Sequence, residues 1–150
     1  MKKLFRLSFV CLVGSFVVAS VAGAGVRASH NVSASLTAGA EVPKPVGAAG
    51  ASGTFSATYV TNKSGAVLKW KLSFSKLTGP ATAAHIHSGK PGVAGAVIVP
   101  LCGPCKSGQS GTTNISKTVV ATLQSGGAYV NVHTTKNAGG EIRGQAKVTG

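Results

Sequence analysis

Apolar and polar residues alternate along most of this chain, and a period of two is typical of β-strands with one buried face. The clearest case is residues 66–75, where four large apolar side chains would face one way and two lysines and a serine the other. This pattern, together with a short apolar run at 96–101, predicts strands over residues 31–37, 52–60, 66–75, 83–89, 96–101, 129–134 and 141–149.

Glycine, proline and other turn-forming residues separate these segments and keep them short. The stretch 102–113 is rich in Gly and Ser, which predicts a loop. Residues 115–126 are ambiguous, because Ser116 can cap a short helix whereas the β-branched residues that follow favour a strand. We favour a short helix near 116–125. The chain is therefore predicted to be all-β, a single-domain antiparallel β-sandwich or flattened Greek-key barrel of seven or eight strands.

Residues 1–28 are predicted to be a secretory signal peptide. Two lysines and an arginine precede an apolar run over 7–21, and small residues follow it. The run is too short for a transmembrane helix. Residues 26–28 (VRA) form a suitable cleavage signal, and 22–24 (AGA) is a second choice. We therefore expect a secreted or periplasmic domain over 29–150, with no transmembrane segment after cleavage.

The charge of the chain narrows the choice of partners. Its formal net charge is +13, from 15 Lys and Arg against 2 Asp and Glu. Loss of Lys2, Lys3, Arg6 and Arg27 with the signal peptide would lower this charge from +13 to +9. A chain this basic is expected to attract an anionic cell-surface partner, although a protein partner stays open. Its lysines are scattered and its aromatic residues few, which argues against specific nucleic-acid binding.

Three of the four histidines fall on predicted strands and are candidate metal ligands. His85 and His87 stand two residues apart, so their side chains share one face of a strand while Ile86 takes the other. His133 lies on a second alternating segment. An H-x-H pair with one remote histidine suits copper or zinc, because both ions bind neutral imidazole. The alternative is that these histidines are only the polar, half-exposed face of a sheet.

Cys102 and Cys105 form a C-x-x-C motif, which has two interpretations. A thiol oxidoreductase would need Cys102 to be exposed at the start of a helix, where its thiol pKa is lowered. No strand–helix–strand unit surrounds this motif, and a Gly- and Ser-rich stretch follows it. In a secreted protein we therefore favour a local disulfide between Cys102 and Cys105.

Six motifs, taken together, resemble the CHRD domain, the module named after chordin and common in bacterial secreted proteins. They occur in family order over roughly 33–147: residues 36–43 (LTAGAEVP), 77–80 (LTGP), 83–89 (AAHIHSG), 99–101 (VPL), 129–134 (YVNVHT) and 140–144 (GEIRG). The resemblance implies an all-β extracellular module. It implies no settled activity, and growth-factor binding by chordin is not transferred to this chain.

The H-x-H strand and residues 137–143 (NAGGEIR) are also similar to parts of the copper–zinc superoxide dismutases. In that family an H-x-H and a later histidine hold copper, and a nearby arginine steers the anion. Carried over by position, this implies a superoxide dismutase-like fold, His85, His87 and His133 as copper ligands, and Arg143 as an anion-guiding residue. The chain has no Asp and no His between His87 and His133, so a complete copper–zinc pair is not expected.

Three functional hypotheses follow. We favour a secreted, non-catalytic binding or structural module with an uncharacterised ligand, in which a mononuclear histidine site would hold a metal such as copper. The alternative is a copper-dependent, dismutase-like redox protein that uses the three histidines with Arg143. The third hypothesis is the thiol oxidoreductase. Convergence of the three imidazoles to within about 2.0–2.1 Å of a common point would discriminate the dismutase-like protein from the binding module.

Overall fold

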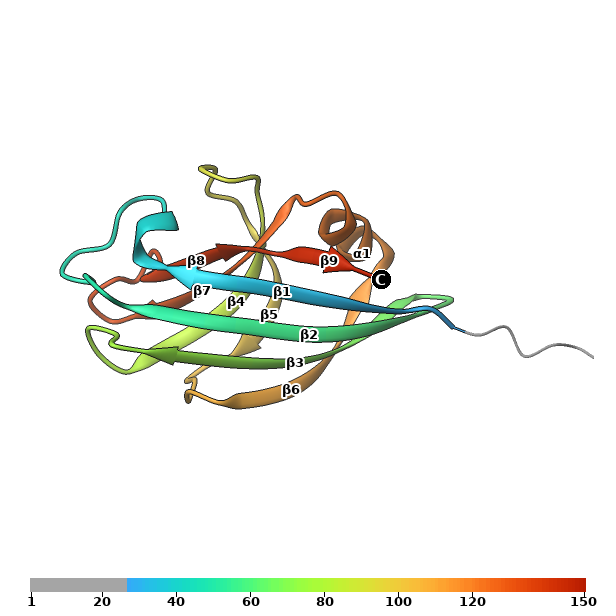
Figure 1. Ribbon diagram of the computed structural model, residues 1–150, viewed down its shortest axis with the longest axis horizontal. Helices are drawn as coiled ribbons and strands as arrows, with labels where there is room; N and C mark the ends of the chain where they lie inside the picture. The colour runs from blue at the N-terminus through green and yellow to red at the C-terminus, as the bar shows by residue number, and fades with distance from the viewer. Residues whose placement is uncertain (1–26) are drawn as a thin grey trace, which may run out of the picture.

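The computed structural model describes residues 27–150, which form a mostly β structure with one short α-helix. Nine antiparallel strands join in the order β5-β4-β7-β8-β1-β2-β3-β6, and β9 also pairs with β1. The strands are β1 (Ser29–Thr37), β2 (Ser52–Asn62), β3 (Gly65–Ser75), β4 (Ala81–Ser88), β5 (Val97–Cys102), β6 (Gln109–Ser116), β7 (Ala128–Thr134), β8 (Ile142–Gln145) and β9 (Lys147–Thr149). Strands β5 and β6, at the two ends of this path, approach each other and nearly close the sheet into a barrel. The predicted all-β fold is confirmed, and Figure 1 shows β1, β2, β3 and β6 in front of β4, β5 and β7.

The predicted signal peptide falls almost entirely on residues 1–26, outside the part of the chain that the structure describes, and it stays a prediction. Among residues 27–150, no helix has the length and apolar character needed to cross a membrane.

One hydrophobic core fills the space between the two layers. Phe55 and Tyr59 of β2 are 2% and 0% exposed, and their partners on β3, Leu72 and Leu68, are both 0% exposed. The alternate positions on both strands point outward and carry serine, threonine and lysine. Burying one large apolar side chain contributes about 2 kcal/mol. The inward and outward faces predicted from the alternation are therefore confirmed for these strands.

The predicted loop over 102–113 is wrong in its second part, because Gln109–Ser116 forms β6 and pairs with β3. A segment rich in Ser, Thr and Gly has little strand preference of its own, so pairing with β3 decides its structure. At Gly111, a Cβ atom would lie 2.4 Å from Cζ2 of Trp70. The glycine that makes this segment look like a loop is thus needed to let the strand lie across the indole ring.

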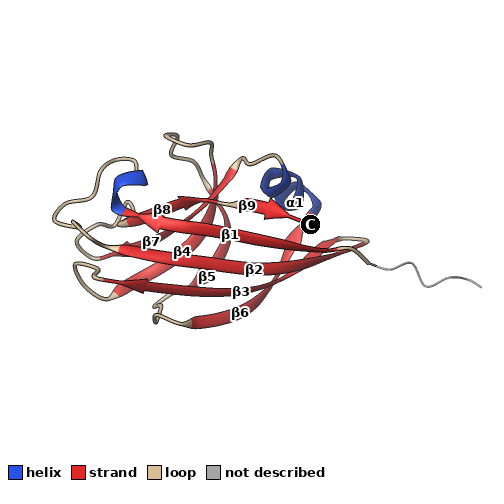
Figure 2. Ribbon diagram, in the orientation of Figure 1, coloured by secondary structure: helices blue, strands red, loops and turns tan. Residues whose placement is uncertain are grey.

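Residues 115–126 contain the short helix that the sequence favoured, α1 (Lys117–Gln124). The Ser116 hydroxyl accepts a hydrogen bond of 3.3 Å from the backbone N–H of Val119, which caps the first turn. The helix buries Val120 and Leu123 against the core. Figure 2 shows α1 and the 3-10 helix η1 (Ala38–Ala40) at opposite ends of the molecule. The predicted last strand divides at Ala146, so that β8 pairs with β7 and β9 pairs with β1.

Candidate metal centre

The structure brings His85, His87 and His133 together on the outer face of two neighbouring strands. Ala84 and Ile86 of β4 are 0% exposed and point into the core, which turns His85 and His87 outward. Strand β7 pairs with β4 so that His133 lies opposite Ala83, diagonally beside His85. Each imidazole offers one nitrogen to a cluster in which all three atoms lie within 4.8 Å of one another.

His87 is oriented by a backbone carbonyl. Its Nδ1 lies 2.8 Å from the carbonyl oxygen of Gly95, so Nδ1 carries the proton and donates it to that oxygen. The other ring nitrogen, Nε2, is buried and has no hydrogen-bond partner among the described residues. A ring nitrogen of this kind keeps a free lone pair, and an N–H bonded to a carbonyl is the usual support of a metal-binding histidine.

His133 has the same arrangement on the other side of the cluster. Its Nδ1 donates a hydrogen bond of 2.9 Å to the carbonyl of Ala138, and its Nε2 lies 3.1 Å from Nδ1 of His85. The atoms that converge are therefore Nδ1 of His85 and Nε2 of both His87 and His133. His85 and His133 share one proton across this 3.1 Å contact. If a cation replaced that proton, both nitrogens could direct a lone pair at the cation.

The surroundings favour the neutral form of His85 and His133. Burial lowers the pKa of His85, and the neighbouring His133 and His87 lower it further. Burial also lowers the pKa of His133, with a smaller contribution from His87, while the bond to Ala138 acts in the opposite direction. Neutral imidazole is the form that binds a metal ion, so the lowered pKa values of His85 and His133 favour metal binding by these two residues.

The loop over 89–96, which supplies the Gly95 carbonyl, is held by Tyr129 and Arg143. The Tyr129 ring stacks on the His87 ring with centroids 5.0 Å apart, and its hydroxyl accepts a hydrogen bond of 3.1 Å from the Gly95 N–H. On β8, the Arg143 guanidinium lies 3.3 Å from the centroid of the same Tyr129 ring. Its Nη2 donates to the carbonyls of Lys90 and Val93, at 3.0 and 2.9 Å.

Arg143 is 2% exposed. Its predicted anion-guiding role stays a prediction, and its observed contacts are those of a group that fastens the 89–96 loop beside His87. Stacking on an aromatic ring and bridging two carbonyls are contacts that the planar guanidinium makes well.

The turn that supplies the Ala138 carbonyl is held by Glu141. This carboxylate is 0% exposed and accepts hydrogen bonds from Thr78, Thr134 and Asn137. Burial by itself would raise the pKa of Glu141, but the hydrogen bonds from these three residues outweigh it and hold the pKa below its ordinary value. The carboxylate is therefore ionised and structural, and it ties the turn to β7 and to the loop that precedes β4.

Glu41 is the second buried carboxylate near the cluster, at 1% exposure. Burial raises its pKa, opposed by the Val42 N–H, by the charge of Arg143 and by Asn131. A Cβ on residue 140 would lie 2.4 Å from Oε2 of Glu41, so Gly140 makes room for this side chain. Neither carboxylate of the chain belongs to the histidine cluster.

Sequence reasoning missed the residues that support the histidines. Tyr129 and Asn131 share the outer face of β7 with His133, and the period-two pattern already placed them there. The two carbonyls that orient His87 and His133 come from loops, and backbone groups leave no signal in side-chain identity.

Cys102 and Cys105 form a disulfide, which confirms the predicted local bridge. Cys102 ends β5 and the next element is β6, so the helix start that a reactive first cysteine requires is not found at this motif. The backbone N–H of Cys105 donates to Ala81 of β4. This backbone bond fastens the loop after β5 to β4, and the disulfide joins the same loop to the end of β5.

The cluster and its supports lie within the part of the chain that matches a known family. The family model of the CHRD domain matches residues 32–146, and the chain therefore belongs to the CHRD domain family. This confirms the resemblance seen in the six motifs, and it indicates a binding or structural module. No curated protein and no solved structure matches the chain.

Proposed function

We propose that this CHRD-domain protein is an exported binding module that holds one transition-metal ion, copper in the first place, between His85, His87 and His133. The observation that carries the proposal is the convergence of three imidazole nitrogens within 4.8 Å of one another. Two of the three rings are supported by backbone carbonyls through their other nitrogen, as metal-binding histidines commonly are.

A cluster of histidines without a metal is the alternative, and the burial of His87 argues against it. Its Nε2 is buried with no hydrogen-bond partner among residues 27–150, and leaving a polar atom in that state costs about 1–3 kcal/mol. A bound cation would relieve this cost and would also replace the single proton between His85 and His133. The arrangement is therefore better explained as a ligand set than as a polar sheet face.

The donor chemistry selects the ion. Three neutral imidazoles suit copper, zinc and nickel, and copper(II) binds such sites most tightly among the first-row divalent ions. No carboxylate or thiolate belongs to the cluster among residues 27–150, so a hard cation such as Mg²⁺ or Ca²⁺ is disfavoured. Three histidine ligands would leave a bound ion open to solvent or to a ligand of the module.

Export is proposed from the sequence and is supported by the Cys102–Cys105 disulfide, because disulfides persist in oxidising compartments. The partner is proposed to be anionic, since the chain is strongly basic. The dismutase-like alternative needs an arginine that meets an incoming anion. The 2% exposure of Arg143 and its two carbonyl contacts favour the binding module instead.

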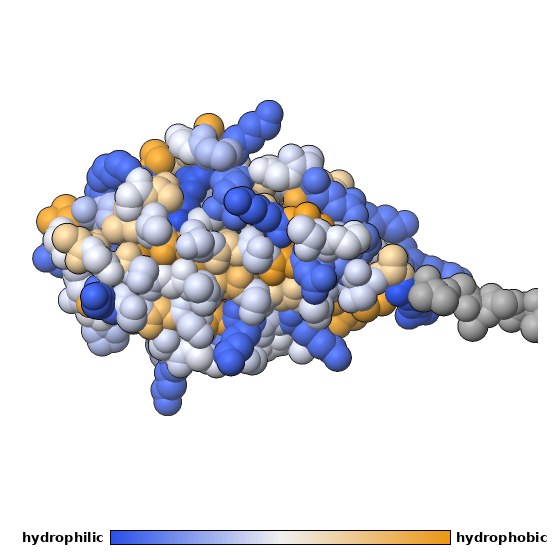
Figure 3. All heavy atoms as spheres, viewed as in Figure 1, coloured by the Kyte–Doolittle hydropathy of each residue, from blue (hydrophilic) through white to orange (hydrophobic). Residues whose placement is uncertain are grey.

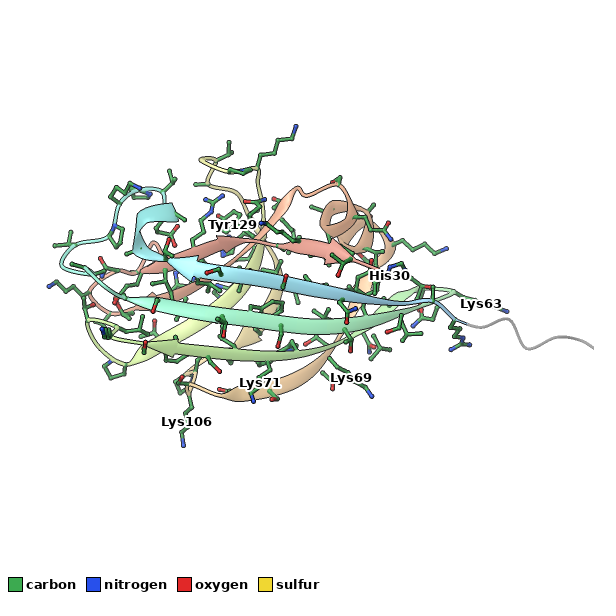
Figure 4. The ribbon with its side chains drawn as sticks, viewed as in Figure 1. His30, Lys63, Lys69, Lys71, Lys106 and Tyr129 are labelled. Atoms are coloured by element: carbon green, nitrogen blue, oxygen red, sulfur yellow. A yellow bond between two sulfur atoms is a disulfide. The ribbon has the colours of Figure 1, made fainter. Side chains whose placement is uncertain are left out.

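Copper titration of the protein purified after export tests this proposal. Wild type should bind one copper ion per chain, and His87→Ala should lose it, as read by metal content and by the nitrogen couplings of bound copper(II). His30→Ala is the matched control, because His30 stacks on Tyr59 and bonds to Gly150, away from the cluster. Figure 4 shows His30 at the far end of β1 from Tyr129, the ring on which His87 stacks.

Copper that persists in His87→Ala but disappears in His30→Ala would contradict the proposal and would place the metal at the chain terminus. If wild type binds no copper, zinc or nickel, the histidines are structural polar residues.

A further inference from the structure

The surface of the described part of the chain carries no side-chain carboxylate. Glu41 and Glu141 are the only acidic residues of the protein, and they are 1% and 0% exposed. The lysines of residues 27–150 are all exposed. Surface lysines commonly have acidic neighbours that neutralise part of their charge, and here no such neighbour is present between residues 27 and 150. The positive charge of these lysines is therefore not neutralised within the described part of the chain, and it can attract an anionic molecule from solution.

Part of this charge lies on a broad sheet face made by the outward side of β9, β1, β2, β3 and β6, which we call the lysine–hydroxyl face. The strand register arranges it in two rows of exposed side chains: Lys147, Ser33, Ser56, Lys71 and Ser110 in one, and Thr149, Asn31, Thr58, Lys69 and Thr112 in the other. With neighbouring strands about 4.8 Å apart, each row is about 19 Å long.

The centre of the face forms a shallow depression of about 650 Å³ between the two rows, with Lys69 and Lys71 among its lining residues. Figure 3 shows pale side chains of intermediate hydropathy over this front surface, with hydrophobic side chains between them and isolated strongly hydrophilic ones among them. Figure 4 shows Lys69, Lys71 and Lys106 extending from the same side of the molecule. The face therefore combines separated positive charges with rows of serine and threonine hydroxyl groups on either side of the depression.

We propose that the lysine–hydroxyl face binds an extended anionic polysaccharide, a polymer of carboxylate-bearing sugars at the cell exterior. Lys69 and Lys71 lie about 7 Å apart along β3, and Lys71 and Lys147 about 14 Å apart across the strands. One polymer chain can thus place several carboxylates on lysines at once. The hydroxyls between the lysines hydrogen-bond to the sugar hydroxyls and ring oxygens.

The composition of the face selects a polysaccharide over other anionic partners. The two rows contain no aromatic side chain on which a base could stack. Trp70, which lines the depression between them, belongs to the core and is only 5% exposed. They also contain no large apolar side chain that could anchor a protein or enter a membrane. The exposed large apolar residues Val46, Val93 and Val97 lie elsewhere, in two loops and in β5.

Individual surface ion pairs are weak and screened by salt, so binding requires several lysines together. The effect of where the lysines lie can therefore be tested separately from the effect of the total charge, by removing equal charge from two different surfaces. The proposal rests on the exported module proposed above only for the location of its ligand, and the histidine cluster lies on the other layer of the sheet.

The experiment measures binding of the exported protein to polygalacturonate, a linear polyuronate, with neutral pullulan as the control polymer. Lys71→Ala with Lys147→Ala should weaken polygalacturonate binding about tenfold at low salt, and added salt should weaken wild-type binding. The matched control is Lys90→Ala with Lys136→Ala, which removes the same charge from two exposed lysines in loops beside β4 and β7. It should change binding less than about twofold.

Equal loss in the two double variants would overturn the proposal and leave only attraction by net charge. Tighter binding of single-stranded DNA than of polygalacturonate at the same salt would also overturn it. Copper binding, measured on the same variants, distinguishes failure of the polysaccharide proposal from failure of the metal-site proposal. The Lys71→Ala and Lys147→Ala protein should keep its copper and its thermal midpoint, and His87→Ala should keep its polygalacturonate binding.

Discussion

Two loops each present a backbone carbonyl to one histidine, His87 or His133, and each loop is held by a buried side chain of opposite charge. The loop over 89–96 presents the Gly95 carbonyl to His87 and is fastened by a buried cation, Arg143. The turn over 134–141 presents the Ala138 carbonyl to His133 and is fastened by a buried anion, Glu141.

The two charges are satisfied differently. Glu141 collects four hydrogen bonds from side chains and backbone, so its charge is well compensated inside the protein. Arg143 donates to carbonyls only through Nη2, while Nη1 is buried and has no hydrogen-bond partner in the described part of the chain. We therefore expect the Glu141 turn to contribute mainly to the stability of the fold and the Arg143 loop mainly to the histidine cluster.

Glu141→Ala should have the largest effect on stability. It removes the acceptor of three donor residues and leaves buried N–H and O–H groups unpartnered, so the free energy of unfolding should fall by about 3–4 kcal/mol. Urea denaturation followed by circular dichroism measures the loss. Glu141→Gln keeps the shape and one acceptor oxygen and should lose about half as much. A loss below about 1 kcal/mol for Glu141→Ala would show that the turn is held by other contacts.

Arg143→Leu should lower stability less, by about 2 kcal/mol, and should weaken copper binding about tenfold because the Gly95 carbonyl is no longer held in place. The measurements are urea denaturation and copper titration. Arg143→Lys is the sharper control, since it keeps the charge but cannot bridge two carbonyls and stack on Tyr129. It should also weaken copper binding. Unchanged copper affinity with a lower rate of superoxide dismutation would instead support the anion-guiding role.

The pH dependence of stability should separate the two carboxylates, with a smaller effect than either substitution. Hydrogen bonds hold the pKa of Glu141 below its ordinary value of 4.5, so its contribution is complete above pH 4.5 and is lost as the pH falls through the lower folded-state pKa. Burial raises the pKa of Glu41 above 4.5, so its effect has the opposite sign.

Thermal midpoints between pH 7 and pH 3 test this difference. Glu141→Gln should lose less stability on acidification than wild type, and Glu41→Gln should lose more. Parallel curves for the two variants would contradict the assignment of the two carboxylates.

Local patterns in the sequence were sufficient for most of the fold. The alternation of buried and exposed positions in β2 and β3 follows directly from residue order, because successive side chains on a strand point to opposite faces. The helix cap at Ser116 is equally local. Strand β6 was missed because its stability comes from β3 and from the fit of Gly111 over Trp70, neither of which is adjacent in sequence.

The sequence by itself determined that His85 and His87 share one face, because a period of two leaves no other arrangement on a strand. The six motifs also determined the family. Only the tertiary structure decided that β7 lies beside β4 and carries His133 to the same point, since residue order does not say which strands are neighbours. It also decided that both carboxylates and Arg143 are buried while the lysines remain exposed, because burial of a charge depends on which loops close over it.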